Sequence, residues 1–263
     1  MNKELINNLN LKIDNRVYKQ IGNINLSLKI YKPENWSRED KRSAIIFFFG
    51  GGWVSGDLDH FEKQSRYLAS RGMMAITPEY RIKNKHNTTP FACVEDGKSA
   101  VNWVAENADN LGIDRDHIAV AGGSAGGHVA ACTVLIDDMG FITGQVSNIP
   151  RAMVLYNPVL NTTESGFGAE ELGNRQRDIS PIHHLDKNVP PTIIFHGTSD
   201  QTVPYANSKN FCEIMQEKGN HCELISYEEK GHGFFNYERE EDHVSFFDTL
   251  EKTEEFLKSI NYL

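Results

Sequence analysis

Short apolar runs alternate with helix-patterned segments along almost the whole chain, and this alternation restricts the fold more than any other feature. The runs are continuous and rich in β-branched and aromatic residues, as in SAIIFFF (43–49) and PTIIFHG (191–197). Such runs are typical of strands buried on both faces, whereas the segments between them place apolar residues at helical spacing. Strands and helices in this order predict a mostly parallel central sheet, flanked by helices on both faces and joined by right-handed crossovers.

The expected elements can be placed along the chain from these patterns. Strands are predicted at 23–33, 43–49, 73–80, 117–122, 152–158, 191–197 and 222–228. Helices are predicted at 61–72, 91–112, 126–136, 205–219 and 241–260. A chain of 263 residues suits a single domain of this class, with residues 1–20 as an N-terminal extension. Reactive groups in such sheets lie in loops beyond the carboxyl ends of strands. These loops are 50–57, 122–127, 198–204 and 230–235.

The segment AGGSAGGHV (121–129) places four glycines around Ser124. A P-loop requires Lys and then Ser or Thr where His128 and Val129 stand, and a dinucleotide-binding fingerprint requires glycine where Ser124 stands. The stretch 122–126 instead satisfies GxSxG between a predicted strand and a predicted helix, the pattern of a nucleophile elbow. Ser124 is therefore the predicted nucleophile, and the alternative is a plain glycine turn closing a β–α unit.

A serine nucleophile needs a base and a group that orients the base. In this architecture the order along the chain is Ser, then Asp or Glu, then His. Asp200 and His232 each follow a predicted strand in that order. Asp186 is the nearest rival acid but follows no strand, and His183 and His184 precede Asp200. The alternatives are an Asx-turn or helix cap for Asp200 and an ordinary turn histidine for His232.

Three consecutive glycines follow the predicted strand 43–49, in FFFGGGWVSGD (47–57). Glycines leave the backbone bare enough for its N–H groups to approach a substrate oxygen. We expect an oxyanion hole formed by the N–H groups of Gly51, Gly52 and Ala125. The alternative is a plain tight turn.

With these motifs, residues 20–260 or so resemble the α/β-hydrolase superfamily, and more closely its hormone-sensitive-lipase-like enzymes and bacterial acetyl esterases. The resemblance rests on GGGW (50–53), PEYR (78–81), GGSAGG (122–127), HGTSDQTVP (196–204) and GHGFF (231–235). It implies the same nucleophile, acid, base and oxyanion donors as those named above. One position departs from the family pattern, because Phe49 stands where a histidine usually precedes the glycines. That histidine braces the loop, so we expect the loop to be supported differently and the hole to remain intact.

The resemblance and the triad imply hydrolysis of an ester through an acyl-enzyme, without a metal or organic cofactor. Short-chain acyl esters, acetyl esters of sugars or polysaccharides among them, are the expected substrates, because the cap is small or absent. Residues 161–178 are the candidate for a small cap. Five aromatic residues are candidates for the pocket wall, with core packing as the alternative: Trp53, Phe167, Tyr205, Phe234 and Phe235.

Other functions with the same triad are a feruloyl-type esterase, an arylformamidase and a prolyl-oligopeptidase-like peptidase. From a different class, a noncatalytic hydrolase-fold binding protein remains open, although such proteins commonly lose a triad member. The net charge of −9 argues against nucleic acid as a partner. No apolar run approaches the ~20 residues of a membrane span. The oligomeric state stays open.

The cellular compartment is open as well. The polar N-terminus predicts either a cytoplasmic protein or an extracytoplasmic one whose signal peptide has been removed. Cys212 and Cys222 in FCEIMQEKGNHCEL (211–224) bracket a helix end and a strand start. A disulfide between them is possible on this spacing, and it would indicate an oxidising compartment.

Overall fold

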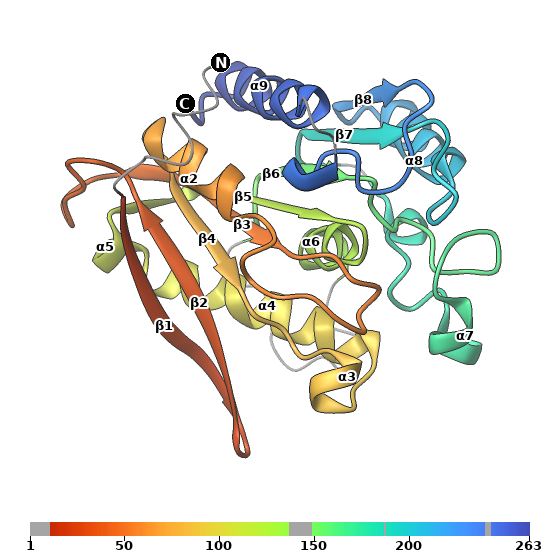
Figure 1. The fold of residues 1–263 in the computed structure, drawn as a ribbon, viewed down its shortest axis with the longest axis horizontal. Helices are drawn as coiled ribbons and strands as arrows, with labels where there is room; N and C mark the ends of the chain where they lie inside the picture. Colours follow the sequence, from red (N-terminus) through yellow and green to blue (C-terminus); the bar gives the residue numbers. More distant parts are fainter. Residues whose placement is uncertain (1–10, 137–148, 187, 240–242) are drawn as a thin grey trace.

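The sheet has the predicted architecture. In the computed structural model, which describes residues 11–136, 149–186, 188–239 and 243–263, eight strands form one sheet in the order β1-β2-β4-β3-β5-β6-β7-β8 (Figure 1). The pairs β1–β2 and β2–β4 are antiparallel, and the other neighbouring strands are parallel. The α/β class with a mostly parallel sheet is confirmed.

The observed bounds follow most of the predicted ones, with two corrections: the predicted helix 91–112 is divided into two helices at Asn107, and the strand predicted at 117–122 begins at Ile113. The strands are β1 (Lys12–Ile21), β2 (Ile24–Lys32), β3 (Arg42–Phe48), β4 (Met74–Pro78), β5 (Ile113–Gly123), β6 (Ala152–Tyr156), β7 (Thr192–Gly197) and β8 (Cys222–Tyr227). The α-helices are α2 (Glu62–Ser70), α3 (Lys83–His86), α4 (Pro90–Glu106), α5 (Ala108–Leu111), α6 (Ala125–Leu135), α7 (Ala169–Leu172), α8 (Tyr205–Glu217) and α9 (Val244–Ser259). The 3-10 helices are η1 (Gly173–Arg175), η2 (Pro181–His184) and η3 (Tyr237–Arg239).

Helices cover both faces of the sheet, and each face has its own apolar core (Figure 1). Successive side chains of a strand point to opposite faces, so β3 sends Ile46 and Phe48 into one core and Ile45 and Phe47 into the other. Helices α4, α6 and α8 complete the first core, and α2 and α9 complete the second. Burial on both faces explains why the central strands read as continuous apolar runs.

Part of the predicted N-terminal extension is a strand, which corrects the assignment of residues 1–20. β1 pairs with β2 across a two-residue turn at Gly22 and Asn23, with Ile21 opposite Ile24. β1 is an edge strand with much of its surface exposed, so it lacks the apolar pattern of the inner strands. Residues 1–10 lie outside the described residues, as do residues 241–242 of the predicted last helix.

The carboxyl ends of the parallel strands carry the four loops singled out from the sequence. The glycine loop follows β3, Ser124 follows β5, Asp200 follows β7 and His232 follows β8. The segment 161–178, predicted as a small cap, contains α7 and η1 and extends beyond β6. Over the described ranges, none of the helices combines the length and the apolar character needed to cross a membrane.

Candidate active site

Ser124 lies in a sharp turn between β5 and α6. Its backbone has φ 55° and ψ −123°, a conformation that L side chains rarely adopt. Close backbone approach explains the glycines beside it, because a Cβ at Gly126 would lie 2.1 Å from the carbonyl oxygen of Phe48. A Cβ at Gly122 would lie 2.4 Å from the carbonyl oxygen of Gly126. The turn therefore requires the GxSxG pattern sterically.

The structure brings Ser124, His232 and Asp200 into one hydrogen-bonded series. The His232 ring has Nε2 at 3.0 Å from Ser124 Oγ and Nδ1 at 2.8 Å from Asp200 Oδ2. A carboxylate only accepts, so Nδ1 carries the proton and Nε2 is free to accept from the serine hydroxyl. This arrangement can remove a proton from Ser124 and hold the resulting imidazolium beside a negative charge.

Asp200 is held in its charged form by several donors. Its Oδ1 accepts the backbone N–H groups of Thr202 at 2.8 Å and Val203 at 2.9 Å. Its Oδ2 also lies 3.2 Å from Nε2 of His196, a buried residue of β7. Burial by itself would raise the pKa of Asp200, but the hydrogen bonds from His196, His232 and Val203 hold that pKa well below its usual value. Asp200 is therefore ionised at neutral pH.

The glycine loop after β3 faces Ser124. Gly51 has φ 128° and Gly52 has φ 62°, both in the region that favours glycine. Val54 and Ser55 donate their N–H groups to the carbonyl oxygen of Gly51, which closes the loop into a tight turn. Ala125 is the first residue of α6, where backbone N–H groups have no partner within the helix.

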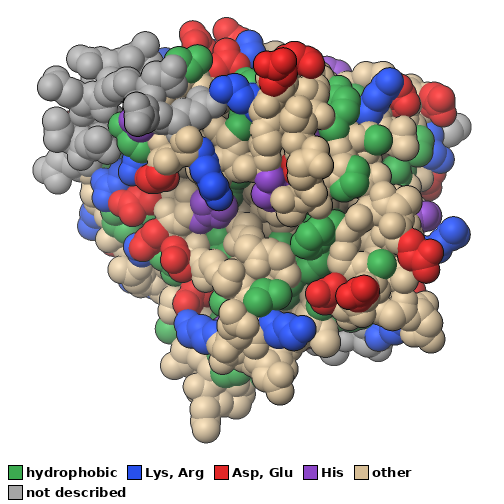
Figure 2. All heavy atoms as spheres, turned by 45° about the vertical axis from the view of Figure 1, so that its right-hand side comes forward, with side chains coloured by type: hydrophobic (Ala, Val, Ile, Leu, Met, Phe, Trp, Pro, Cys, Tyr) green, Lys and Arg blue, Asp and Glu red, His purple; other side chains and the backbone are tan. Residues whose placement is uncertain are grey.

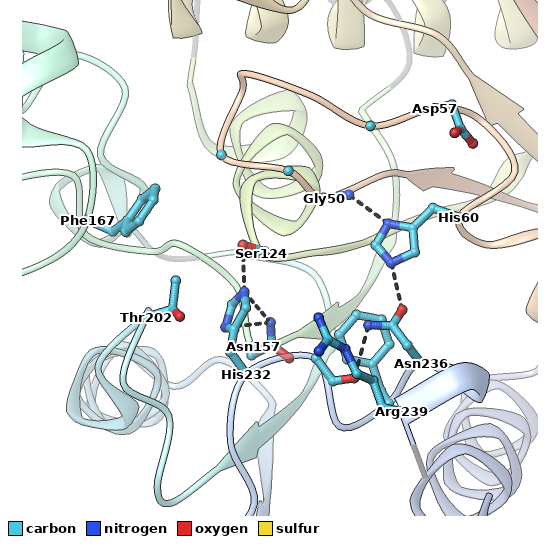
Figure 3. Close-up of a pocket in the computed structure, with 15 residues that line it drawn as sticks. Gly50, Asp57, His60, Ser124, Asn157, Phe167, Thr202, His232, Asn236 and Arg239 are labelled. Carbon is cyan, nitrogen blue, oxygen red and sulfur yellow. Dashed lines mark hydrogen bonds between the residues drawn. The ribbon is translucent and has the colours of Figure 1, made fainter. Parts of the chain in front are cut away.

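A cavity of about 540 Å³ opens above these residues. Figure 2 shows histidine side chains around a hollow near the middle of the face turned forward. The close-up in Figure 3 places Phe167 on one side of Ser124, with Asp57, Asn236 and Arg239 on the other. The lining residues are Gly50, Gly51, Gly52, Gly56, Asp57, His60, Ser124, Asn157, Phe167, Thr202, His232, Gly233, Phe235, Asn236 and Arg239.

Comparison with known proteins identifies the family. The sequence matches BD-FAE over residues 28–163 and 157–215, which is more than half of the chain. The chain belongs to the BD-FAE family. With it the chain belongs to the serine esterases of the α/β-hydrolase superfamily, a class of carboxylic ester hydrolases. The resemblance inferred from the sequence motifs is thereby confirmed.

Two solved structures and one curated protein illustrate the similarity. Thermogutta terrifontis esterase 2 phosphoramylated by tabun is 45% identical, covers 95% of this chain and 96% of that chain, and has a TM-score of 0.91. The same esterase with propionate bound is 44% identical, with 95% of each chain covered and a TM-score of 0.90. Esterase LipC of Mycobacterium tuberculosis (strain ATCC 25618 / H37Rv) is 28% identical over 230 residues, 76% of this chain and 56% of LipC. The chain spans about half the length of the curated relatives it matches, 48% and 56% of the first two.

Two of the five aromatic residues predicted for the pocket wall, Phe167 and Phe235, line the cavity of this BD-FAE member. The other three belong to the surrounding packing, which corrects their assignment. Trp53 is buried behind Phe167 and donates its indole N–H to Nδ1 of His128 at 3.2 Å.

Tyr205 and Phe234 do not line the cavity, because the side chain of each packs against other residues. The Tyr205 ring packs edge-on against His196, and its hydroxyl hydrogen bonds to Ser226 at 2.6 Å. Phe234 packs against Tyr227 with ring centroids 4.5 Å apart, inside the second core. Each residue therefore has a packing role.

Several residues of the site were not predicted. Asn157 directly follows β6, so the strand-end rule that found Asp200 applied to it as well. Its Nδ2 lies 3.3 Å from Nδ1 of His232. His60 and Asn236 lie in loops and carry no local signal, because the hydrogen bond between them spans 176 positions of the chain.

Cys212 and Cys222 are neighbouring buried thiols. Both are free in the structure, and the neighbouring Cys222 side chain lowers the pKa of Cys212. The amide of Gln216 donates to Cys212 Sγ at 3.6 Å and to the carbonyl oxygen of Cys222 at 2.8 Å. A bridge between them stays a prediction. In the part of the chain that the structure describes, no three His, Cys, Asp or Glu side chains are grouped to hold a metal ion.

Proposed function

We propose that the chain hydrolyses short-chain acyl esters, with Ser124 as nucleophile, His232 as general base and acid, and Asp200 as the group that orients His232. The observation that carries this proposal is the hydrogen-bonded path from the Ser124 hydroxyl through His232 to Asp200, at a cavity wide enough for a small ester. The strained turn at Ser124 supports the same assignment, because it exposes the hydroxyl at the start of α6.

The first half of the reaction acylates the serine. Nε2 of His232 takes the hydroxyl proton while Oγ of Ser124 forms a bond to the ester carbonyl carbon. The N–H groups of Gly51, Gly52 and Ala125 stabilise the tetrahedral oxyanion, each donor contributing ~3 kcal/mol to the barrier reduction. The carbon–oxygen bond to the alcohol then breaks, and His232 gives its proton to the departing alcohol oxygen.

The second half returns the enzyme to its starting state. Water attacks the acyl carbonyl carbon as His232 takes one of its protons, and the same N–H groups stabilise the second oxyanion. The bond between the acyl carbon and Ser124 Oγ then breaks, and His232 returns the proton to the serine. The acid product leaves and no other reactant is consumed.

The residues that line the cavity support a small acyl group on a polar alcohol. Phe167 lies on one side of Ser124 and offers an apolar wall for a short acyl chain (Figure 3). Asp57, Asn236 and Arg239 lie on the other side and offer hydrogen-bonding partners for hydroxyl groups. Acetylated sugars and polysaccharides fit a cavity with one apolar side and one polar side, because they carry a short acyl group on an alcohol rich in hydroxyl groups. A 44% identical esterase with propionate bound supports a short acyl group.

The test is a rate series on p-nitrophenyl esters from acetate to octanoate, with Ser124→Ala as control. Activity that falls steeply beyond butyrate and drops by several orders of magnitude in Ser124→Ala would support a short-acyl serine esterase. Stoichiometric labelling by paraoxon in the wild type, absent from Ser124→Ala, would identify the nucleophile independently. Serine-independent hydrolysis, or none at any chain length, would contradict the proposal.

A second series would separate the substrate classes. Acetylated xylose, methyl ferulate, an aryl formamide and a proline peptide are compared at equal concentration. Faster hydrolysis of acetylated xylose supports a polar alcohol, whereas faster turnover of one of the other three would replace this substrate proposal with that class.

A further inference from the structure

His60 lies beside the glycine loop and uses both of its ring nitrogens. The backbone N–H of Gly50 donates to Nδ1 of His60 at 3.0 Å, and Nε2 lies 2.6 Å from Oδ1 of Asn236 (Figure 3). All three residues line the same cavity as Ser124. The ring also packs against the aromatic rings of Phe61 and Phe235, with centroids 4.8 and 6.0 Å away.

The hydrogen bonds determine the tautomer of the ring. A backbone N–H only donates, so Nδ1 of His60 must be the unprotonated acceptor. The amide nitrogen of Asn236 donates to the carbonyl oxygen of Gly233 at 2.9 Å, which leaves its oxygen to accept from Nε2 of His60. The ring must be neutral for both bonds to form. Burial lowers the pKa of His60 against the opposing effect of the hydrogen bond to Asn236, and so favours the neutral form.

The ring connects two loops that the proposed reaction needs. Gly50 is the first of the three glycines, directly before Gly51 and Gly52. Asn236 belongs to the loop that carries His232, and its amide holds the carbonyl of the residue directly after that histidine. One imidazole therefore joins the loop of the expected oxyanion donors to the loop of the base.

Phe49 cannot supply this connection. Its ring stacks on Tyr80 with centroids 4.0 Å apart and has no hydrogen-bonding group. The hydroxyl of Tyr80 donates to the carbonyl oxygen of Phe49 at 2.6 Å, so the backbone at this position is held from one side. His60 holds the next residue, Gly50, from a position ten residues further along the chain.

We propose that His60 is a positioning residue that holds Gly50 so that the N–H groups of Gly51 and Gly52 face the reacting carbonyl oxygen, and that it ties this loop to the His232 loop through Asn236. This inference rests on the ester hydrolysis proposed above. His60 contacts no reacting atom and acts through the backbone of the glycine loop. Its loss should therefore affect the transition state more than the ground state.

The test compares three variants on p-nitrophenyl acetate and on a trifluoromethyl ketone that forms a tetrahedral adduct with a reactive serine. His60→Ala removes both hydrogen bonds, and we expect kcat to fall ~30-fold with KM changed less than ~3-fold. Affinity for the ketone should fall by the same factor as kcat. His60→Asn keeps an acceptor near the position of Nδ1 and should recover the greater part of both losses.

Asn236→Leu leaves the bond to Gly50 but removes both the acceptor for Nε2 and the donor to the carbonyl oxygen of Gly233, so kcat and ketone affinity should fall together by ~5-fold. This variant tests the inference even where His60→Ala does not fold. The matched control is His86→Ala, because Nδ1 of His86 also accepts a backbone N–H, that of Ile82 at 3.0 Å, away from the cavity. It should leave kcat and ketone affinity unchanged.

Two results would overturn the inference while the proposed function stands. One is serine-dependent hydrolysis that is the same in the wild type, His60→Ala and Asn236→Leu. The other is a loss of kcat without loss of ketone affinity, which would indicate a purely structural role. Absence of Ser124-dependent hydrolysis from the wild type would instead remove the proposed function and this inference together.

Discussion

Replacing Asp200 with asparagine tests the proposed triad most directly, because every contact to this carboxylate comes from a donor. Oδ1 accepts the N–H groups of Thr202 and Val203, and Oδ2 accepts from His232 and lies near Nε2 of His196. Asparagine keeps one oxygen and turns the other into an NH₂ group, which needs an acceptor. In either orientation of the asparagine amide, its NH₂ group therefore faces N–H groups that themselves need an acceptor.

The orientation with NH₂ toward His232 forces Nδ1 to accept and moves the ring proton to Nε2. That proton then faces Oγ of Ser124, 3.0 Å away, and the ring can no longer take the serine proton. We expect kcat to fall ~10⁴-fold. This corresponds to about 5.5 kcal/mol in the barrier. KM should change less than ~3-fold, since substrate contacts are untouched.

The assay is steady-state hydrolysis of p-nitrophenyl acetate, with active-site titration to count competent enzyme. Asp186→Asn is the matched control, because Asp186 precedes β7, the strand that Asp200 follows, and was the other candidate acid in the sequence. That variant should keep wild-type kcat. A fall of less than about tenfold in Asp200→Asn would refute the reasoning, since a triad without its orienting acid loses far more.

Three further results are expected. Gly126→Ala should lower both the free energy of unfolding and kcat/KM, because its Cβ would lie 2.1 Å from a backbone oxygen. Gly231→Ala is the control and should be nearly neutral, because its Cβ would meet nothing within 4 Å. Equal effects of the two substitutions, measured by chemical denaturation and by kinetics, would contradict this. Because the folded pKa of Asp200 is depressed, its stabilising contribution is complete above about pH 4 and is lost as the pH falls toward the folded pKa. The difference in free energy of unfolding between the wild type and Asp200→Asn should therefore shrink below about pH 4. A difference that stays constant down to about pH 3 would contradict this stabilising contribution of Asp200. Protein recovered from an oxidising compartment should show two free thiols on denaturation without reductant if Cys212 and Cys222 are bridged, and four would exclude the bridge.

The inner strands of the sheet and the sharp turn at Ser124 could be predicted from the sequence, because each is determined by a local pattern. Inner strands are buried on both faces and read as continuous apolar runs, and the steric limits at Gly122 and Gly126 leave a recognisable motif. β1 escaped prediction because an exposed edge strand has no such run, although Gly22 and Asn23 carried a turn signal.

Other features depend on contacts that no local pattern records. An aromatic residue can pack on either side of its loop, so Phe167 and Phe235 could not be separated from Trp53 by residue type. The proposed role of His60 depends on its bond to Gly50 and on its bond to Asn236, which is 176 positions away in the chain. The one clue was Phe49, which implied that some other residue must support the glycine loop.

The distance along the chain between His60 and Asn236 has a consequence for biosynthesis. The two residues are 176 positions apart, so Asn236 is made roughly 10 to 35 s after His60 at ordinary rates of translation. During that interval Asn236 is not yet present to bond His60, so the glycine loop is not joined to the loop that carries His232, even when β3, β4 and β5 have already paired. Activity should therefore be the last property to appear on the ribosome or in refolding, later than the compact sheet, and would serve as a reporter of the completed chain.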